Sequence, residues 1–414
     1  MSGDYDVVVV GAGAAGIAAT RRLVDAGISV VLVEARDRVG GRAWTVATPD
    51  GFPIDLGCGW LHSADENPWR KIAEARGFAI DRTPPPWARP TVPKGEPSEQ
   101  QRQFGEVIWK FRSQLDDFPE EGPDRSAGSF LTPGDKWNPL LEAVSTFYSG
   151  AELELISTRD LARYGDTGVN WRVVDGYGTL ITAYAAGLPV ALGTVVTRID
   201  HSGTRIRIDT NRGAFTARAA VVTLPTNVIA ANEALFAPLL PEKIDAARGL
   251  PLGLAAKLYL ALDGADEFHV ESRVFGSALT SATAGYHFRP FGHPVIEAYF
   301  GGSFAAELED GPDDSFFAHA RSELGAIFGS DFTRRIHPLA QHRWGRDPFA
   351  LGAYSYAVPG HADDRAALAA PVDGRIFFAG EATSRDHYST AHGAYLTGIT
   401  AADAALAVLT RQAT

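Results

Sequence analysis

The chain has 414 residues, of which 45% are hydrophobic and 21% are charged, and its formal net charge is −12. This composition is typical of a soluble protein with more than one domain, and the acidic balance argues against nucleic acid or an anionic membrane as partner. A single cysteine excludes a disulfide within the chain, and the eleven histidines show no metal-ligand spacing, so no metal site is expected. Because the first predicted strand follows Met1 almost directly and no run of about 18 apolar residues occurs, we expect neither a signal peptide nor a membrane span, and a cytoplasmic location.

The first predicted elements are a strand, a glycine-rich turn and a helix. Val7–Val10 is an all-apolar, β-branched run, as is typical of a buried parallel strand. Gly11, Gly13 and Gly16 follow it with the spacing G-x-G-x-x-G, which suits a tight turn, close approach to a pyrophosphate, and close packing of helix on strand. The following helix, expected over residues 14–26, directs its N-terminal amides at the phosphates. This order of elements predicts a dinucleotide site.

The next segment indicates which dinucleotide is bound. Residues 28–33 form the predicted second strand, and Glu34 at its end can accept hydrogen bonds from a ribose hydroxyl. Gly41 can bring the backbone close to the ligand, and Arg42 can form paired hydrogen bonds with phosphate oxygens. The run E-A-R-x-R-x-G-G-R, which starts at Glu34, resembles the FAD signature of the glutathione reductase-like flavoproteins. The resemblance implies FAD rather than NAD.

The centre of the chain contains irregular, helical and strand-like stretches. Residues 84–97 are rich in proline and charge, and we expect them to form a surface excursion between domains. Helical periodicity is predicted over residues 99–118 and 137–148. A second β-rich region is expected from residues 252–262 onward. Three strands separated by hairpin signals are expected earlier, at residues 195–199, 205–209 and 215–222.

The C-terminal part, like the N-terminal part, combines a predicted buried strand with a glycine and the start of a helix. A last strand is predicted over residues 375–379, followed by Gly380 and Glu381, and a helix is predicted over residues 391–409. We therefore expect an α/β fold with a discontinuous Rossmann-type FAD-binding domain of the glutathione reductase kind and a second, α+β substrate-binding domain built on a mixed sheet. The FAD-binding domain is expected at residues 1–78, 188–248 and 345–414, and the substrate-binding domain at residues 79–187 and 249–344.

A series of motifs in order makes the chain similar to the flavin-containing amine oxidases, the family of monoamine and polyamine oxidases. After the N-terminal FAD run come I-D-L-G-C-G-W-L-H from residue 54, V-D-G-Y-G-T-L from 174, V-V-T-L-P from 221, A-K-L from 256, G-A-Y-S-Y from 352, F-A-G-E-A-T from 378 and H-G-A-Y from 392. The D-L-G-x-x-W-L-H and Y-S-Y patterns place the resemblance closest to the polyamine oxidase branch.

The resemblance implies three residues that act on the substrate. Lys257 matches the family lysine that holds a water at flavin N5, and Tyr354 matches one wall of an aromatic cage in front of the flavin. The second wall is often a tyrosine three residues before Gly393, where this chain has Thr390, so only half of the cage is expected. His62 takes a position that faces the substrate in polyamine oxidases, where it either orders the distal end of an amine or packs as a structural residue.

The resemblance also implies the residues around the cofactor. Ala391 would present its amide to the flavin pyrimidine oxygen, where a helix N-terminus stabilises negative charge. Ala353 stands where monoamine oxidases carry the cysteine that binds FAD covalently, so non-covalent FAD is predicted. The expected cofactor contacts are Gly11, Gly13, Ala14, Ala15, Gly16, Glu34, Ala35, Arg36, Gly41, Arg42, Gly57, Cys58, Gly59, Trp60, Val196, Trp344, Gly380, Glu381, Thr390 and Ala391.

The predicted activity follows from the resemblance. The protein is expected to oxidise an amine C–N bond to an imine, which water hydrolyses to an aldehyde or ketone plus amine or ammonia, while O₂ is reduced to hydrogen peroxide. The cofactor carries the redox chemistry, so neither a metal nor a nucleophilic triad is required. The expected partners are a small-molecule amine and O₂, with no nucleic acid or membrane, and the expected state is a monomer or a homodimer.

Other substrates and roles stay open at this point. An oxidase or monooxygenase of the same fold acting on an L-amino acid would need an arginine for the carboxylate, and Arg163, Arg172 and Arg289 are candidates. A polyamine would need carboxylates for its additional ammonium groups, which Glu152 and Glu154 are candidates to supply. A chromatin-associated demethylase would need an added interaction module or a basic surface, and the sequence predicts neither.

Overall fold

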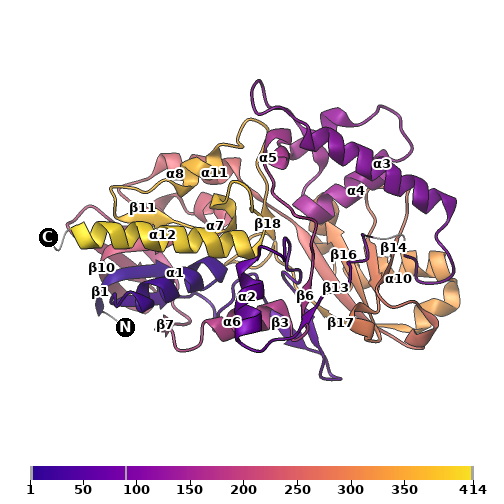
Figure 1. The fold of residues 1–414 in the computed structure, drawn as a ribbon, viewed down its shortest axis with the longest axis horizontal. Helices are drawn as coiled ribbons and strands as arrows, with labels where there is room; N and C mark the ends of the chain where they lie inside the picture. Colours follow the sequence, from indigo (N-terminus) through magenta and orange to yellow (C-terminus); the bar gives the residue numbers. More distant parts are fainter. Residues whose placement is uncertain (1–2, 89–90, 412–414) are drawn as a thin grey trace.

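Two sheets lie toward opposite ends of an elongated molecule (Figure 1). The computed structural model describes residues 3–88 and 91–411. Within them, the larger sheet consists of β1 (Gly3–Val10), β2 (Val30–Val33), β7 (Val190–Ala191), β8 (Val196–Asp200), β9 (Ile206–Thr210), β10 (Gly213–Val222), β11 (Phe236–Ala237) and β19 (Ile376–Phe378). Their order is β11-β8-β9-β10-β1-β2-β7, and β19 also pairs with β10. Segments far apart in the sequence therefore share one sheet.

The centre of the larger sheet is apolar on both faces. Val9 of β1 lies between Leu32 of β2 and Val221 of β10, in parallel register, and all three side chains are fully buried. The first half of β10 pairs antiparallel with the hairpin strand β9, whereas its last three residues pair parallel with β19. A continuous β-branched run such as residues 7–10 suits this position because helices cover both faces of a parallel sheet.

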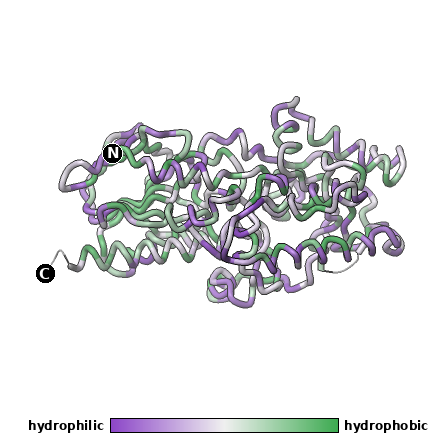
Figure 2. Tube along the Cα trace, turned by 90° about the horizontal axis from the view of Figure 1, so that it is seen from above, coloured by the Kyte–Doolittle hydropathy of each residue, from purple (hydrophilic) through white to green (hydrophobic). Residues whose placement is uncertain are grey.

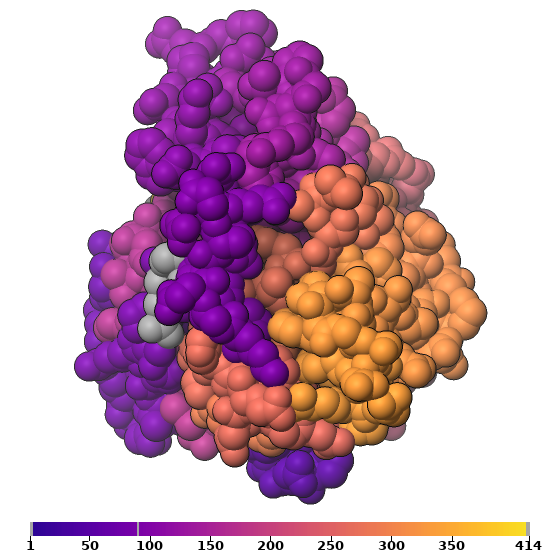
Figure 3. All heavy atoms as spheres, turned by 90° about the vertical axis from the view of Figure 1, so that its right-hand side faces the viewer, coloured from indigo at the N-terminus to yellow at the C-terminus, as the bar shows by residue number. Residues whose placement is uncertain are grey.

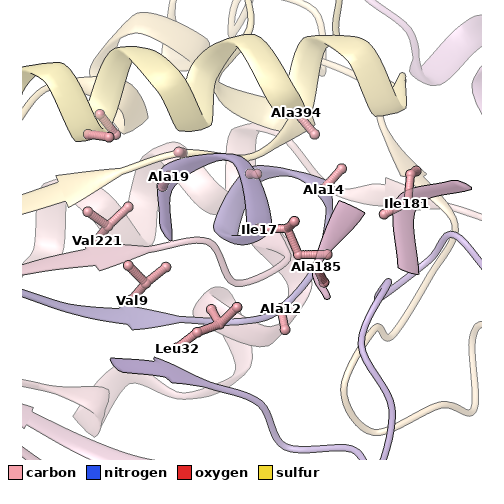
Figure 4. Packing of buried hydrophobic residues seen from close by; sticks show 14 of the residues in the cluster. Val9, Ala12, Ala14, Ile17, Ala19, Leu32, Ile181, Ala185, Val221 and Ala394 are labelled. Atoms are coloured by element: carbon pink, nitrogen blue, oxygen red, sulfur yellow. The ribbon is translucent and has the colours of Figure 1, made fainter. Parts of the chain in front are cut away.

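Two helices from opposite ends of the sequence cover one face of this sheet. α1 (Ala14–Asp25) lies between the strands and α12 (Ala391–Arg411), as Figure 4 shows around Ile17 and Ala394. The two helices approach closely because Gly398 has no side chain: a Cβ there would lie 2.2 Å from the carbonyl oxygen of Ala15. Among the described residues, α12 is the helix with the length and composition to cross a membrane, with a mean hydropathy of 1.3. One side of it packs on α1, and Figure 2 shows the hydropathy along this helix, which leads to the C-terminus.

The second sheet is antiparallel throughout. Its strands, in spatial order, are β14 (Ser272–Phe275), β15 (Gly285–Phe288), β16 (Val295–Gly301), β13 (Ala255–Leu262) and β17 (Ile336–Gln341). The expectation of a mixed sheet is wrong here, because short connections join β14 to β15 and β15 to β16, and such hairpins force antiparallel pairing. Leu258 and Ala298 face a core with α9 (Gly302–Asp310) and α10 (Ser315–Phe328), whereas the opposed pair Lys257 and Tyr299 faces the other way.

Further elements fill the space around and between the two sheets. Figure 3 shows the end of the molecule remote from the chain termini, where the purple segment around α3 lies above the orange segments of the second sheet. The helices are α2 (Pro68–Ala75), α3 (Glu99–Asp116), α4 (Asn138–Ser149), α5 (Thr158–Ala162), α6 (Tyr177–Tyr184), α7 (Thr226–Ala231), α8 (Pro241–Gly249) and α11 (Asp364–Ala369). The short strands form three pairs: β3 (Thr45–Ala47) with β4 (Pro53–Asp55), β5 (Ile80–Asp81) with β6 (Arg172–Val173), and β12 (Leu252–Gly253) with β18 (Tyr354–Ser355).

The secondary structure predicted from the sequence is confirmed in these elements. The helices predicted at residues 99–118 and 137–148 are α3 and α4, and the three hairpin strands are β8, β9 and β10. The described residues of the proline-rich stretch 84–97 contain neither helix nor strand, and Trp87 from this stretch packs edge-on against Trp60 with ring centroids 4.5 Å apart.

Candidate active site

The turn after β1 forms a backbone cradle at the start of α1. Gly11 has a φ of +98°, and a Cβ on Gly16 would lie 1.8 Å from the Gly11 carbonyl oxygen, so both positions require glycine. A Cβ on Gly13 would meet nothing within 4 Å, which leaves open space in front of the α1 amides. A Cβ on Gly41 would lie 3.1 Å from the Gly13 Cα, so the second glycine segment closes the same cradle. This geometry fits a pyrophosphate at a helix N-terminus.

Glu34 lies at the end of β2, where a ribose is expected. Its buried carboxylate accepts hydrogen bonds from the Ala12 amide at 2.7 Å and from the Arg36 amide at 2.8 Å. These bonds fix the carboxylate and leave lone pairs free to accept hydrogen bonds from hydroxyl groups. The Arg36 guanidinium is held by Asp347 at 2.6 Å, and both side chains are almost buried.

Arg42 and Glu381 join the N-terminal and C-terminal parts of the cofactor region. Arg42 Nη1 donates to the Ala353 carbonyl oxygen at 2.7 Å and to Glu381 Oε1 at 2.9 Å. Glu381 Oε2 accepts from the Ser355 hydroxyl at 2.6 Å and from the Ser389 amide at 2.9 Å. Burial alone would raise the pKa of Glu381, but the Arg42 charge and the Ser355 hydrogen bond lower it below its ordinary value. The carboxylate is therefore ionised where a cofactor would pass.

One cavity of about 1010 Å³ extends from the α1 cradle to the second sheet. It is lined by every predicted cofactor residue except Gly16, and by Lys257, Tyr354 and His62. Gly16 instead faces the turn itself, as the Cβ position shows. The size of the cavity and its mainly apolar lining suit a dinucleotide with room for a small substrate beside it.

The segment 57–59 forms a narrow part of the cavity wall. A Cβ on Gly57 would lie 1.7 Å from the Arg42 carbonyl oxygen, so only glycine lets this segment pack closely on the Arg42 backbone. Trp344 packs behind the segment, and its Nε1 donates to the Leu56 carbonyl oxygen at 3.0 Å. Burial raises the pKa of the Cys58 thiol to about 12, so the thiol stays protonated and is a poor nucleophile.

Lys257 projects from β13 to this wall. Its Nζ lies 3.0 Å from Glu297 Oε1 and 3.1 Å from the Asp55 carbonyl oxygen, and a Cβ on Gly59 would be 3.3 Å away. Burial alone would lower the pKa of Lys257, but the Glu297 carboxylate raises it well above its ordinary value. The site therefore holds a fixed positive charge against residues 57–59.

Glu297 continues into a chain of buried charges that the sequence analysis missed. His287 lies between two carboxylates, with Nε2 2.8 Å from Glu271 Oε2 and Nδ1 3.7 Å from Glu297 Oε2. Burial alone would lower the pKa of His287, but the two carboxylates raise it. Glu271 also pairs with Arg172 at 2.6 Å. The signal in the sequence was a single glutamate within the otherwise apolar strand V-I-E-A-Y-F-G.

Comparison with known proteins identifies the family. Residues 14–147 and 128–406 match the family described as flavin containing amine oxidoreductase. The chain belongs to this family. Polyamine oxidase 3 of Oryza sativa subsp. japonica is 32% identical, over 96% of this chain and 88% of that protein. Polyamine oxidase 2 of Arabidopsis thaliana is 31% identical, over 96% and 87%. A putrescine oxidase variant with redesigned cofactor binding has the same fold, with a TM-score of 0.77 at 17% identity, covering 98% of this chain and all of that one.

The protein is thus a flavin-dependent amine oxidase of the polyamine oxidase branch that uses FAD. The glycine cradle, Glu34 and the Arg42–Glu381 pair fit this cofactor from the α1 cradle to residues 57–59. Val196 of β8 and Ala391, the first residue of α12, line the same cavity.

A second tyrosine lies beside Tyr354, where only half of an aromatic cage was expected. Tyr299 of β16 lies beside Tyr354, with the two hydroxyl oxygens 3.4 Å apart. Thr390 has another role: its Oγ1 accepts a hydrogen bond from the Gly393 amide at 2.9 Å and so caps α12. Tyr388 is turned to the Asp160 carbonyl oxygen, to which its hydroxyl donates at 2.9 Å. Tyr299 therefore places a second aromatic ring beside Tyr354 in the cavity wall, from a strand that none of the sequence motifs includes.

His62 lines the substrate part of the cavity as a neutral side chain. Its Nδ1 donates to Asn170 Oδ1 at 2.6 Å, which leaves Nε2 as an acceptor. Burial is the main cause that lowers the pKa of His62. A neutral imidazole that accepts a hydrogen bond is suited to an N–H or O–H group of a substrate.

The arginines considered for an amino-acid carboxylate are engaged elsewhere. Arg163 pairs with Glu120 and with Asp363 at 2.8 Å, and Arg289 pairs with Asp266 at 2.9 Å. Arg172 is neutralised within the buried charge chain. The two glutamates considered for a polyamine are also engaged: Glu152 accepts from Ser303 and Glu154 from Ser126. Neither glutamate lines the cavity.

Proposed function

We propose that this amine oxidase binds a neutral amine and removes two electrons and two protons from its C–N unit, which gives an imine. Water then hydrolyses the imine to a carbonyl compound plus ammonia or an amine. O₂ takes up the two electrons and two protons and leaves as hydrogen peroxide. When bound, FAD supplies the hydride acceptor for the first half and the electron donor for the second.

The observation that carries this proposal is the position of Lys257. A buried ammonium held by Glu297 lies against residues 57–59, where the motif resemblance places the flavin ring. A fixed positive charge at this point stabilises negative charge that develops during the transfer of electrons, and it does so without reorganisation. It also holds a donor ready to fix a water or deliver a proton.

The other side chains position the amine. Tyr354 and Tyr299 present two aromatic rings beside Lys257, and these rings exclude water from the reacting carbon and guide the nitrogen. His62, which lines the same cavity, is a neutral acceptor for a hydrogen bond from the substrate. The chain itself contributes orientation, desolvation and charge.

Two measurements test the proposal. Anaerobic mixing of the yellow protein with a panel of alkylamines, diamines and polyamines is expected to bleach the flavin, and readmission of O₂ is expected to give one hydrogen peroxide per amine consumed. Lys257→Met is expected to keep FAD bound and to slow flavin reduction or reoxidation about tenfold to a hundredfold. Lys71→Met on α2 is the matched control, because Lys71 is exposed. Unchanged kinetics of Lys257→Met would contradict the role of the ammonium.

The alternative of an L-α-amino acid is not favoured by the site. The three arginines considered for its carboxylate are engaged in ion pairs. A carboxylate one bond from the reacting carbon would have to be bound between Lys257 and Tyr354. The Lys257 ammonium already donates to Glu297 and to the Asp55 carbonyl oxygen, so few of its hydrogen-bond donors are left for a second carboxylate.

A further inference from the structure

The cavity-facing side of the second sheet carries a regular row of polar side chains. Arg273 on β14 is directly opposite His287 on β15, which is opposite Glu297 on β16. Residues opposed in antiparallel strands share a face, so Arg273 points to the same side as the charges that surround Lys257. Arg273 lines the cavity at the edge of the sheet remote from Lys257.

Arg273 lacks the counter-ion that the other buried arginines have. Among residues 3–88 and 91–411, it forms neither an ion pair nor a hydrogen bond, and its guanidinium only lies over the Phe275 ring, 5.2 Å from the centroid. Arg172 and Arg365, by contrast, are neutralised by carboxylates at 2.6–2.7 Å. A partly buried guanidinium without an anion is costly, so an anion from outside the chain would stabilise this site.

The acidic side chains of the cavity do not fill this role. Glu297 is held by Lys257 and His287. Asp116 lies at the exposed rim of the cavity, one helical turn after Arg112, and can form an ion pair with that arginine. Asp166 is also exposed, and its carboxylate accepts a hydrogen bond from the Gly168 amide. The two carboxylates at the rim are exposed to water, whereas Arg273 on β14 is partly buried.

An aromatic wall connects the reacting end of the cavity to Arg273. Tyr354 and Tyr299 touch at their hydroxyls. The Tyr299 ring packs edge-on against Phe147, with centroids 6.0 Å apart, and Phe147 stacks on Phe275 at 6.3 Å. Such a wall suits an apolar spacer between two polar ends.

Resting on the proposed amine oxidation, we infer that the substrate is an amine that carries a carboxylate at the end remote from the reacting carbon, and that Arg273 binds this carboxylate. The exposed Arg112, whose guanidinium lies over the Tyr148 ring at the rim, is the second cation at this end. A guanidinium binds a carboxylate through two parallel hydrogen bonds. A polyamine would place an ammonium against Arg273 and be disfavoured.

The sheet also sets a scale for the length of the substrate. β13 and β14 are separated by two intervening strands, β16 and β15, so their backbones are about 14 Å apart at the usual strand spacing. An α-amino acid cannot span from the Lys257 end to Arg273. An ω-amino carboxylate with an apolar spacer of several methylene groups can do so.

Three amines of equal chain length test the inference. They are octylamine, ω-aminooctanoate and octane diamine, which differ only in the remote group; shorter homologues locate the best length. We expect kcat/KM for the amino carboxylate to exceed that for octylamine by about tenfold to a hundredfold, the effect of a hydrogen bond to a charged group. The diamine is expected to be the poorest. A diamine that is preferred over octylamine would overturn the inference.

Variants assign the effect to one side chain. Arg273→Gln is expected to reduce the preference for the carboxylate over octylamine to within about threefold, and Arg273→Lys to retain part of it. Arg334→Gln is the matched control, because this arginine is exposed and remote from the cavity, and the preference should not change. An unchanged preference in Arg273→Gln would overturn the inference.

A binding measurement separates this inference from the proposed function. Octanoate cannot be oxidised as an amine, and its dissociation constant can be measured from the absorbance change of the bound flavin. We expect Arg273→Gln to weaken octanoate binding at least tenfold, and equal binding to both proteins would overturn the inference. If none of the amines reduces the flavin, the proposed oxidation fails, while octanoate binding still decides whether Arg273 is a carboxylate site.

Discussion

Replacing Glu297 by glutamine removes one negative charge from the buried pair with little change in shape. The Lys257 and Glu297 side chains are only 8% and 13% exposed, and their charged atoms are 3.0 Å apart. Removal of one partner from a buried pair costs about 3–5 kcal/mol, because the remaining charge is left uncompensated. The loss also has an upper limit, because Lys257 can lose its proton instead. At about pH 7 this costs about 1.36 kcal/mol for each of about 3.4 pH units, or about 4.6 kcal/mol. We therefore expect a free energy of unfolding lower by about 3–4.6 kcal/mol.

The same replacement changes how stability depends on pH. In the native protein Glu297 raises the pKa of Lys257 above its unfolded value, so this stabilising contribution is fully present below about pH 10.4 and is lost only as pH rises through the folded pKa. Without Glu297, burial lowers the pKa of Lys257 below its unfolded value. The unfolded chain then binds more protons than the folded one, and the stability of the variant rises with pH.

The assay is urea unfolding of the FAD-loaded proteins between about pH 6 and about pH 9. The deficit of Glu297→Gln relative to the native protein should narrow as pH rises, by up to about 1.4 kcal/mol per pH unit. Glu307→Gln on α9 is the control, because Glu307 is exposed, and it should differ little from the native protein at any pH. A deficit below about 1 kcal/mol, or one that widens with pH, would refute the argument that the pair is a buried, charged one.

Two further predictions concern the cofactor. Acid precipitation should release all of the yellow colour, because Ala353 offers no nucleophile and the Cys58 thiol stays protonated; colour in the pellet would show a covalent bond. Gly16→Ala should lose FAD and unfold at a lower urea concentration, because its Cβ would lie 1.8 Å from a carbonyl oxygen. Gly105→Ala on α3 is the control: a Cβ there meets nothing within 4 Å, so this change should stabilise the protein by about 0.5–1 kcal/mol. Normal FAD content in Gly16→Ala would contradict the close packing of the turn.

The cofactor cradle could be predicted from the sequence because its signals are local. The turn at Gly11, the helix that follows and Glu34 all lie within one strand-helix-strand unit, whose spacing alone fixes their contacts. The hairpin strands β8, β9 and β10 were predicted for the same reason. In a hairpin the turn residues lie directly between the two strands, so the sequence itself marks where each strand ends.

The substrate side could not be predicted in this way. Glu297, Tyr299 and Arg273 come from different strands, and their proximity to Lys257 depends on the register of the second sheet. Glu297 interrupts an otherwise apolar strand, and the sequence alone does not show that its charge is paired with Lys257. Thr390 is the opposite case. The motif comparison singled out this position, but it did not predict that the Thr390 side chain caps the N-terminus of α12.

The order of strands in the larger sheet has a consequence for biosynthesis. β10 receives β1 along one edge and β19 along the last part of the other, although β19 follows β10 by more than one hundred and fifty residues. Most of the polypeptide is therefore synthesised before β19 can pair with β10. Until then the last part of one edge of β10 has no neighbouring strand in the nascent chain. Coexpressed chaperones that shield this edge should raise the yield of yellow protein for this reason.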